Sequence, residues 1–165
     1  MNLAIAGLGF MGVTHLKAAM DSSKVRVAAV VSSDPKKLSG DFSDVGGNLD
    51  TTTSQIDLSN VKKYRRLEEA LADREIDAID LCLPTNLHAP ATVAALRSGK
   101  HVLVEKPMAL NLEEASLMIA EAAKAKRTLM CAQVLRFFPQ YSVLQPGQIL
   151  SGRFRRRCAA PVWGE

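Results

Sequence analysis

The sequence has few cysteines and no long apolar run, and both absences narrow its class. Its three cysteines are an odd number, and no two of them stand at the spacing of metal ligands. This pattern excludes a disulfide scaffold and favours a reducing compartment. The apolar segment at the amino terminus is too short to span a bilayer and carries no basic leader like that of a signal peptide. We therefore expect a cytoplasmic protein without a membrane partner.

An excess of one charge is also absent from most of the chain. The 21 Lys and Arg outnumber the 17 Asp and Glu by four, and the four arginines at positions 153, 155, 156 and 157 account for this difference. Aromatic residues, on which unstacked bases commonly stack, make up only 5% of the sequence. We therefore expect no nucleic-acid partner.

What the chain does contain is a regular alternation of apolar strands and amphipathic helices. At 165 residues with 47% hydrophobic composition, it can form one domain with a substantial core. The alternation predicts an α/β fold, a Rossmann-like doubly wound parallel sheet covered on both faces. Residues 40–60 are rich in Gly, Asp, Ser and Thr and predict a loop with one weak strand at most. The expected strands are 2–6, 25–31, 78–83, 101–105 and 129–132, and the expected helices are 11–20, 67–72, 89–98 and 112–125.

Three glycines follow the first expected strand at the spacing G-x-G-x-x-G and precede a helix. In this context Gly7 permits a tight turn, Gly9 lets the backbone approach a diphosphate, and Gly12 allows close packing of helix on strand. The backbone amides of the turn, including those of Phe10 and Met11, and the helix N-terminus form an anion site. The motif predicts that a dinucleotide binds here.

The end of the second strand bears on which dinucleotide is bound. An acidic residue about 20 positions after the glycines ordinarily binds the ribose hydroxyls and repels a 2′-phosphate. Here Ser32 occupies that place, Ser33 follows it, and Lys36 and Lys37 are within reach. Hydroxyl and ammonium donors suit a phosphate dianion, so NADP is favoured. If the strand ends later, Asp34 becomes the ribose ligand and NAD is preferred; otherwise it is a turn residue before a short helix.

Two polar segments follow later strands. One reads Leu83-Pro84-Thr85-Asn86-Leu87-His88, and the other reads Glu105-Lys106-Pro107. Both stand at the carboxyl ends of strands, which is the edge where open α/β sheets bind ligands. We expect the chemistry of the protein at this edge.

These segments, the glycine motif and the stretch AQVLRFFP at residues 132–139 together resemble the Gfo/Idh/MocA family of oxidoreductases. Four motifs in the right order are far more specific than one. The resemblance implies a Rossmann domain that binds NAD or NADP, followed by a second α/β domain. It also implies hydride transfer at a hydroxyl-bearing carbon of a sugar, polyol or related small molecule.

The resemblance assigns roles to individual residues. It implies that Lys106 sits beside the nicotinamide and the reacting hydroxyl, where an ammonium group stabilises negative charge on oxygen. Glu105 then holds this lysine, and Pro107 shapes the turn, with a cis peptide as one option. Arg136 resembles an arginine near the nicotinamide end of the cofactor.

The same resemblance assigns Leu83, Pro84, Asn86 and His88 to the loop that lines the cofactor. For His88 a second interpretation stays open, a histidine at a helix start bonded to backbone. The other two histidines, His15 and His101, are expected to be structural. None of the three stands at ligand spacing with carboxylates or cysteines, so we predict no metal site.

The domain boundaries follow from the extent of the resemblance. We expect residues 1–141 to form the Rossmann domain and residues 142–165 to be a short remnant of the start of the second domain, with a strand at 148–157. One strand cannot bury itself without its sheet. Phe154 and Trp163 would then lie exposed, pack on the domain or contact a partner chain.

Two functions therefore remain open at this point. The first is an NADP-preferring oxidoreductase of which this chain is the dinucleotide-binding half. Since most of the substrate site would belong to the second domain, Lys106 alone is half of an active site. The second is a non-catalytic binding module or subunit that associates through its carboxyl-terminal strand, as a homo-oligomer or with another chain.

Overall fold

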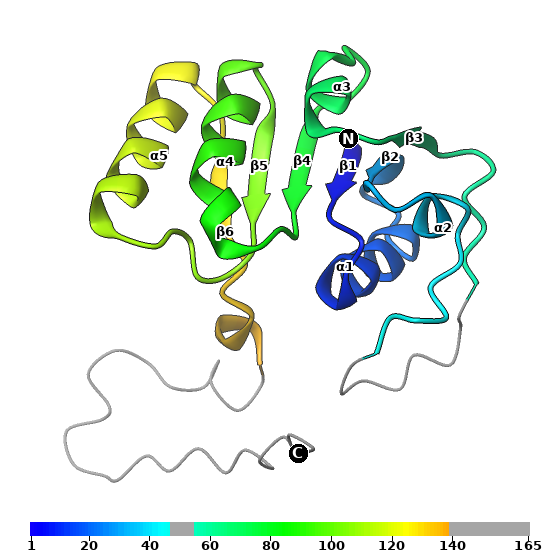
Figure 1. Ribbon diagram of the computed structural model, residues 1–165. Helices are drawn as coiled ribbons and strands as arrows, with labels where there is room; N and C mark the ends of the chain where they lie inside the picture. Colours follow the sequence, from blue (N-terminus) through cyan, green and yellow to red (C-terminus); the bar gives the residue numbers. More distant parts are fainter. Residues whose placement is uncertain (47–54, 139–165) are drawn as a thin grey trace, which may run out of the picture.

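The computed structural model of the 165-residue chain describes residues 1–46 and 55–138 (Figure 1). The expected remnant at 142–165, its strand at 148–157 and the proposed association through that strand lie outside the described residues.

The described part of the chain forms one six-stranded sheet in which every paired strand is parallel (Figure 1). Its order is β3-β2-β1-β4-β5-β6, so the winding reverses between β1 and β4. The crevice at such a reversal is where doubly wound sheets bind dinucleotides. The predicted fold class is confirmed. The strands are β1 (Asn2–Ala6), β2 (Arg26–Val31), β3 (Lys62–Tyr64), β4 (Ala78–Leu81), β5 (His101–Val104) and β6 (Leu129–Cys131).

One strand differs from the expectation. The sequence predicted no strand at 62–64, yet β3 pairs with β2 there, with Lys62 opposite Ala29 and Tyr64 opposite Val31. The strand escaped notice because it is only three residues long, lies at the sheet edge and has two exposed lysines in place of an apolar run. This edge strand matters because it fixes the residue that follows it.

In the part of the chain that the structure describes, five α-helices and one 3₁₀ turn connect the strands, and a second 3₁₀ turn follows the last strand. The amino-terminal end of α5 is capped by Asn111, whose side chain accepts from Glu114 N at 2.8 Å, and the Glu114 carboxylate accepts from the amide of the preceding residue, Leu110, at 3.0 Å. The helices are α1 (Phe10–Met20), α2 (Pro35–Leu38), α3 (Leu67–Ala72), α4 (His88–Arg97) and α5 (Leu112–Ala125), and the 3₁₀ turns are η1 (Thr85–Leu87) and η2 (Val134–Phe137).

Alternate residues of the strands build two cores, one on each face of the sheet. In β1, Ala4 and Ala6 pack in the cluster that includes α3, α4 and α5, whereas Ile5 packs in the cluster that includes α1. Figure 1 shows α4 and α5 side by side, with α1 and α2 across the sheet reversal from them. Burial on both faces explains why the strands read as nearly continuous apolar runs. Among the described residues, no helix combines the length and the apolar character that crossing a membrane requires.

Candidate dinucleotide-binding site

The glycine turn is possible only because two of its residues lack a side chain. Gly7 has φ +92°, and a Cβ there would collide with the carbonyl oxygen of Cys82. A Cβ on Gly12 would collide with the carbonyl oxygen of Gly7. The Gly7 amide donates to Val31 O at 3.0 Å, which ties the turn to β2. These contacts agree with the tight turn expected of Gly7 and the close packing expected of Gly12.

Gly9 is different, because its neighbourhood is open. Apart from its two neighbours in the chain, no described residue has an atom within 4 Å of where its Cβ would stand, and Gly9 is the N-cap of α1. Within the described part of the chain, no side chain caps this helix and no acidic residue lies in its first turn. Phe10 and Met11 begin the helix, so their amides belong to the uncapped first turn, where an anion is stabilised.

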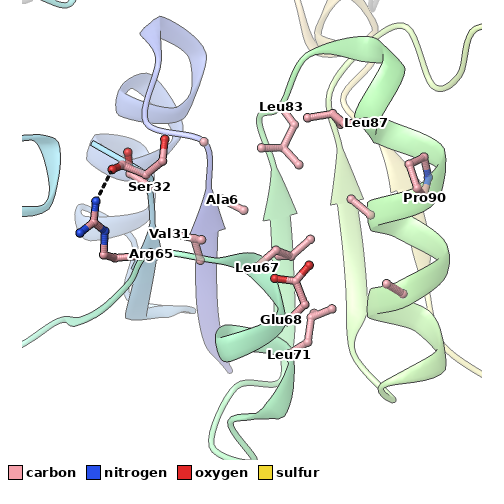
Figure 2. Close-up of a pocket in the computed structure, with 14 residues that line it drawn as sticks. Ala6, Val31, Ser32, Arg65, Leu67, Glu68, Leu71, Leu83, Leu87 and Pro90 are labelled. Carbon is pink, nitrogen blue, oxygen red and sulfur yellow. Dashed lines mark hydrogen bonds between the residues drawn. The ribbon is translucent and has the colours of Figure 1, made fainter. Parts of the chain in front are cut away.

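A cleft of about 430 Å³ opens between the carboxyl ends of β1 and β2 on one side and α3 and α4 on the other (Figure 2). Its walls are mainly apolar, with Leu67 and Leu71 from α3 and Leu83, Leu87 and Pro90 from the β4–α4 connection and α4. Figure 2 shows the polar groups Ser32 and Arg65 at one end, and Glu68 on the α3 wall. An apolar slot with a few polar groups at one end suits a nucleoside.

The geometry of the short helix that follows bears on the role of Asp34. Asp34 is the N-cap of α2, and its carboxylate accepts from Lys36 N at 2.9 Å. β2 ends at Val31, so Ser32 comes directly after the strand and accepts from Asp34 N at 3.2 Å. Asp34 therefore occupies the turn role, and the serine stands at the end of the strand. The neighbouring lysine side chains differ, because Lys36 Nζ lies 4.0 Å from Asp41 and 3.8 Å from Asp44, whereas Lys37 is half-buried on α2.

Arg65 is a site residue that the sequence analysis did not find. It follows β3 directly, and the pairing of Ser32 N with Tyr64 O at 3.1 Å brings the end of β3 against the end of β2. Its exposed guanidinium donates to Ser33 O at 3.2 Å. The basic run KKYRR at residues 62–66 was the available signal, but without the edge strand it could not be placed at the cleft.

The other end of the site is built on β4 and β5. Lys106 is exposed two residues beyond β5, and its backbone amide donates to Glu105 Oε2 at 2.9 Å. The peptide bond between Lys106 and Pro107 is cis, as one of the expected options had it. Glu105 is buried at 5% exposure, so its carboxylate fixes the turn from inside.

His88, which the resemblance assigns to the loop that lines the cofactor, is held by backbone groups. It is only 1% exposed, and its ring nitrogens lie 2.7 Å from Pro107 O and 2.8 Å from Leu83 O. These are the contacts of the structural interpretation that the sequence left open. The histidine bridges the β4–α4 connection to the Lys106 turn, so it supports the site through its contacts with backbone carbonyl groups.

The remaining predicted residues lie on connections at the carboxyl edge. Pro84 and Asn86 are exposed around η1, and Leu83 lines the cleft. Arg136 is exposed in η2, which lies beyond the carboxyl edge of the sheet (Figure 1). Their contacts with a cofactor stay predictions.

His15, expected to be structural, lies among buried acids. Its Nδ1 is 2.8 Å from Asp80 Oδ2 and its Nε2 is 3.2 Å from Glu105 Oε1. The hydrogen bond with Asp80 raises the pKa of His15, with smaller contributions from the charges of Asp80 and Glu105, against the opposing effect of burial. Burial, together with the two carboxylates, strongly raises the pKa of the Cys82 thiol.

Ligand atoms of His15, Asp80 and Cys82 lie within 4.8 Å of one another, as in a metal-binding group. The prediction of no metal site used spacing along the sequence. It missed this group because the three residues come together only when α1 packs beside β4.

With this geometry in place, the relatives of the chain can be compared. Residues 1–133 match the oxidoreductase family Gfo/Idh/MocA, described as having an NAD-binding Rossmann fold. The chain belongs to this family.

Two similar proteins are dehydrogenases. The D-xylose 1-dehydrogenase (NADP(+)) 2 of Haloferax volcanii is 32% identical over 139 residues, which are 84% of this chain and 39% of that protein. The 4-carboxy-2-hydroxymuconate-6-semialdehyde dehydrogenase of a Sphingobium species is 28% identical over 152 residues, 92% of this chain and 44% of that protein. The chain thus spans about two fifths of the length of these two relatives.

The solved structures agree on the fold. The crystal structure of an NAD-binding protein from Listeria innocua superposes with a TM-score of 0.64 at 26% identity, covering 82% of this chain and 36% of its own. The Gfo/Idh/MocA Rossmann domain of this chain is therefore placed by sequence and by structure, and it corresponds to the nucleotide-binding part of longer proteins.

Proposed function

We propose that this chain is the dinucleotide-binding domain of an NADP-preferring oxidoreductase that transfers hydride at a hydroxyl-bearing carbon of a sugar or polyol. One observation supports the cofactor preference above all others: Ser32 stands at the end of β2 where an acid selects NAD, and Arg65 is held beside it. Asp34, the nearest carboxylate in sequence, is bonded to the backbone of α2.

The residues present fit such a cofactor along its whole length. The open space at Gly9 and the uncapped start of α1 suit the diphosphate. Ser32, Ser33 and the Arg65 guanidinium suit a 2′-phosphate, to which Lys37 on the neighbouring helix adds positive charge. The apolar walls of the cleft suit an adenine ring.

Lys106 is the residue that we assign to the chemistry. When bound, a nicotinamide cofactor supplies or accepts the hydride. The ammonium of Lys106 would hydrogen-bond the substrate oxygen and stabilise the negative charge that develops on it. Exposure of Lys106 at the carboxyl edge leaves it free to meet a substrate held by a second domain.

The substrate class is supported by the family and by one relative. The D-xylose dehydrogenase is named for a sugar and for NADP, in agreement with both parts of the proposal. A cytoplasmic, reducing setting accords with Cys82 and Cys131 being free thiols.

Calorimetric titration of the full chain with NADPH and NADH tests the proposal. We expect tighter binding of NADPH by the wild type. Ser32→Asp should lower the ratio of NADPH to NADH affinity about a hundredfold, because a carboxylate there repels the 2′-phosphate and accepts from ribose hydroxyls. The control is Asp21→Asn, which removes an exposed carboxylate at the far end of α1, outside the cleft, and should leave the ratio unchanged. Equal binding of both cofactors by the wild type would refute the preference, and no binding of either would refute the proposed function.

A further inference from the structure

The described residues contain one buried ionic cluster that the proposed chemistry does not use directly. Asp80 on β4 is 2% exposed and Glu105, which follows β5, is 5% exposed. β4 and β5 are neighbours in the sheet, and His15 reaches both carboxylates from α1. α1 is the helix whose N-terminus forms the candidate diphosphate site.

The number of protons on the imidazole follows from its contacts with two carboxylates; Nδ1 also lies 3.4 Å from Cys82 Sγ. Nδ1 lies 2.8 Å from Asp80 Oδ2, and Nε2 lies 3.2 Å from Glu105 Oε1. A neutral imidazole has a single N–H, so one of its nitrogens would present a lone pair to a carboxylate oxygen. Only the doubly protonated ring presents an N–H to both carboxylates. Within the described part of the chain, Glu105 Oε1 is buried and has no hydrogen-bond partner, so the charge of the ring, 3.2 Å away, is what compensates it.

Glu105 passes this constraint on to Lys106. Its second oxygen, Oε2, accepts from the backbone amide of Lys106 at 2.9 Å. The carboxylate is therefore held at both ends, by the ring of His15 and by the turn that carries the lysine. A ring nitrogen of His88 lies 2.7 Å from Pro107 O, so two histidines, half-buried His15 and buried His88, support the residues flanking Lys106.

We propose that His15 is a positioning residue, which as a doubly protonated ring bridges Asp80 and Glu105 and thereby fixes the Lys106 turn against the helix that begins the dinucleotide site. The inference rests on the proposed function only for the role of Lys106; the bridge itself follows from the contacts. Its consequence is that the geometry at Lys106 depends on pH through a group that touches neither cofactor nor substrate.

A metal ion is a less suitable link between these groups. The 2.8 Å between His15 Nδ1 and Asp80 Oδ2 is a hydrogen-bond distance. Two such ligands of one tetrahedral zinc ion stand about 3.3 Å apart. The Cys82 thiol donates to Asp80 Oδ1 at 3.6 Å, so it is paired with a carboxylate in this arrangement.

The dependence on pH has a defined direction. The titratable groups that face the ring are Asp80 and Cys82 on the β4 side and Glu105 on the β5 side. The two carboxylates favour the protonated ring, which accords with the raised pKa of His15. As the pH rises through that pKa, the ring loses one proton and one of the two contacts, and the hold on Glu105 weakens.

An NMR titration of the full chain tests the inference through two signals, the ring nitrogens of His15 and the backbone amide of Lys106. We expect both His15 nitrogens to be protonated at pH 6.5 and to titrate with a midpoint above that value. The Lys106 amide should shift with the same midpoint, because it is bonded to Glu105. In Glu105→Gln the His15 midpoint should move down.

The control is His101→Gln, which removes a half-buried histidine whose Nδ1 accepts from Thr128 N at 3.0 Å and which should leave both signals unchanged. His15→Gln should abolish the shift of the Lys106 amide with pH. The wild-type titration needs no variant, so it decides the question even if His15→Gln does not fold.

A His15 midpoint below 6.5, or a Lys106 amide that does not follow it, would overturn the inference. Added Zn²⁺ that shifts the His15 signals at micromolar concentration would also overturn it, in favour of a metal site. Because these signals are read without cofactor, failure of NADPH to bind would count against the proposed function and not against the bridge.

Discussion

The two ends of the cofactor site are built from different kinds of contact. At the β2 end, Ser32 and Arg65 are half-buried or exposed, and Arg65 is held by one hydrogen bond to a carbonyl oxygen. At the β4–β5 end, Asp80 and Glu105 are buried and joined through His15. In the proposed function, cofactor choice depends on side chains that can change without unfolding the domain, whereas the proposed position of Lys106 depends on a buried network.

The largest expected effects distinguish the glycine that the fold requires, Gly12, from the glycine that cofactor binding requires, Gly9. Gly12→Ala places a methyl group against Gly7 O and should lower the free energy of unfolding by about 3 kcal/mol, measured by urea titration. Gly9→Ala has room for its methyl group and should change that free energy by less than about 0.5 kcal/mol. The same methyl group occupies the space assigned to the diphosphate, so Gly9→Ala should weaken NADPH binding at least tenfold.

Similar destabilisation by both substitutions would show that the two glycines do not divide these roles. Unchanged NADPH binding by Gly9→Ala would place the diphosphate elsewhere.

The next prediction concerns the exposed β2 end of the candidate cofactor site. Arg65→Ala should weaken NADPH binding about tenfold, the equivalent of ~1.4 kcal/mol, and leave NADH binding within about twofold. The matched control is Arg66→Ala, because Arg66 Nε is paired with Glu69 Oε1 at 3.0 Å. Fluorescence or calorimetric titration measures both. A loss shared equally by NADPH and NADH would indicate that Arg65 stacks on the adenine and does not read the phosphate.

A third prediction concerns stability at the buried end. The folded pKa of His15 is raised, so its stabilising contribution is complete below pH 6.5 and is lost as the pH rises through the folded pKa. The wild type should therefore exceed His15→Gln in free energy of unfolding by more at pH 6 than at pH 9. Denaturant titrations at the two pH values measure this, with His101→Gln as control. An advantage that grows with pH would mean that His15 is buried as a neutral ring.

The smallest effect concerns Asp34. Asp34→Ala removes the N-cap of α2 and should cost about 1 kcal/mol or less, because α2 has only four residues. NADH affinity should stay within about twofold, since the carboxylate serves the helix. Asp34→Asn keeps the cap and should restore the stability. A tenfold loss of NADH affinity in either variant would assign Asp34 to the ribose.

Local patterns predicted much of this molecule. The strand-turn-helix around Gly7, Gly9 and Gly12 could be predicted because all the residues that define it lie within about a dozen positions of one another. The parallel sheet followed from strands and helices that alternate regularly. The cis peptide before Pro107 was among the options that the motif allowed.

Contacts between distant segments could not be read in the same way. Arg65 was missed because it depends on β3, an edge strand whose lysines give no apolar signal. His15 lies 65 positions from Asp80 along the chain, and nothing local pairs them. His88 was assigned to the cofactor loop because its motif was recognised. Its ring contacts with two backbone carbonyl groups depend on how the Lys106 turn packs, which the motif does not show.

A crystal structure of the full chain with NADPH tests the central claim most directly. We predict that the diphosphate lies at the N-terminus of α1, beside Gly9. The 2′-phosphate should lie within hydrogen-bond distance of Ser32 and Arg65, and the nicotinamide should face Lys106. A dinucleotide bound away from the β1–β4 crevice, or with its adenosine ribose on Asp34, would contradict the account.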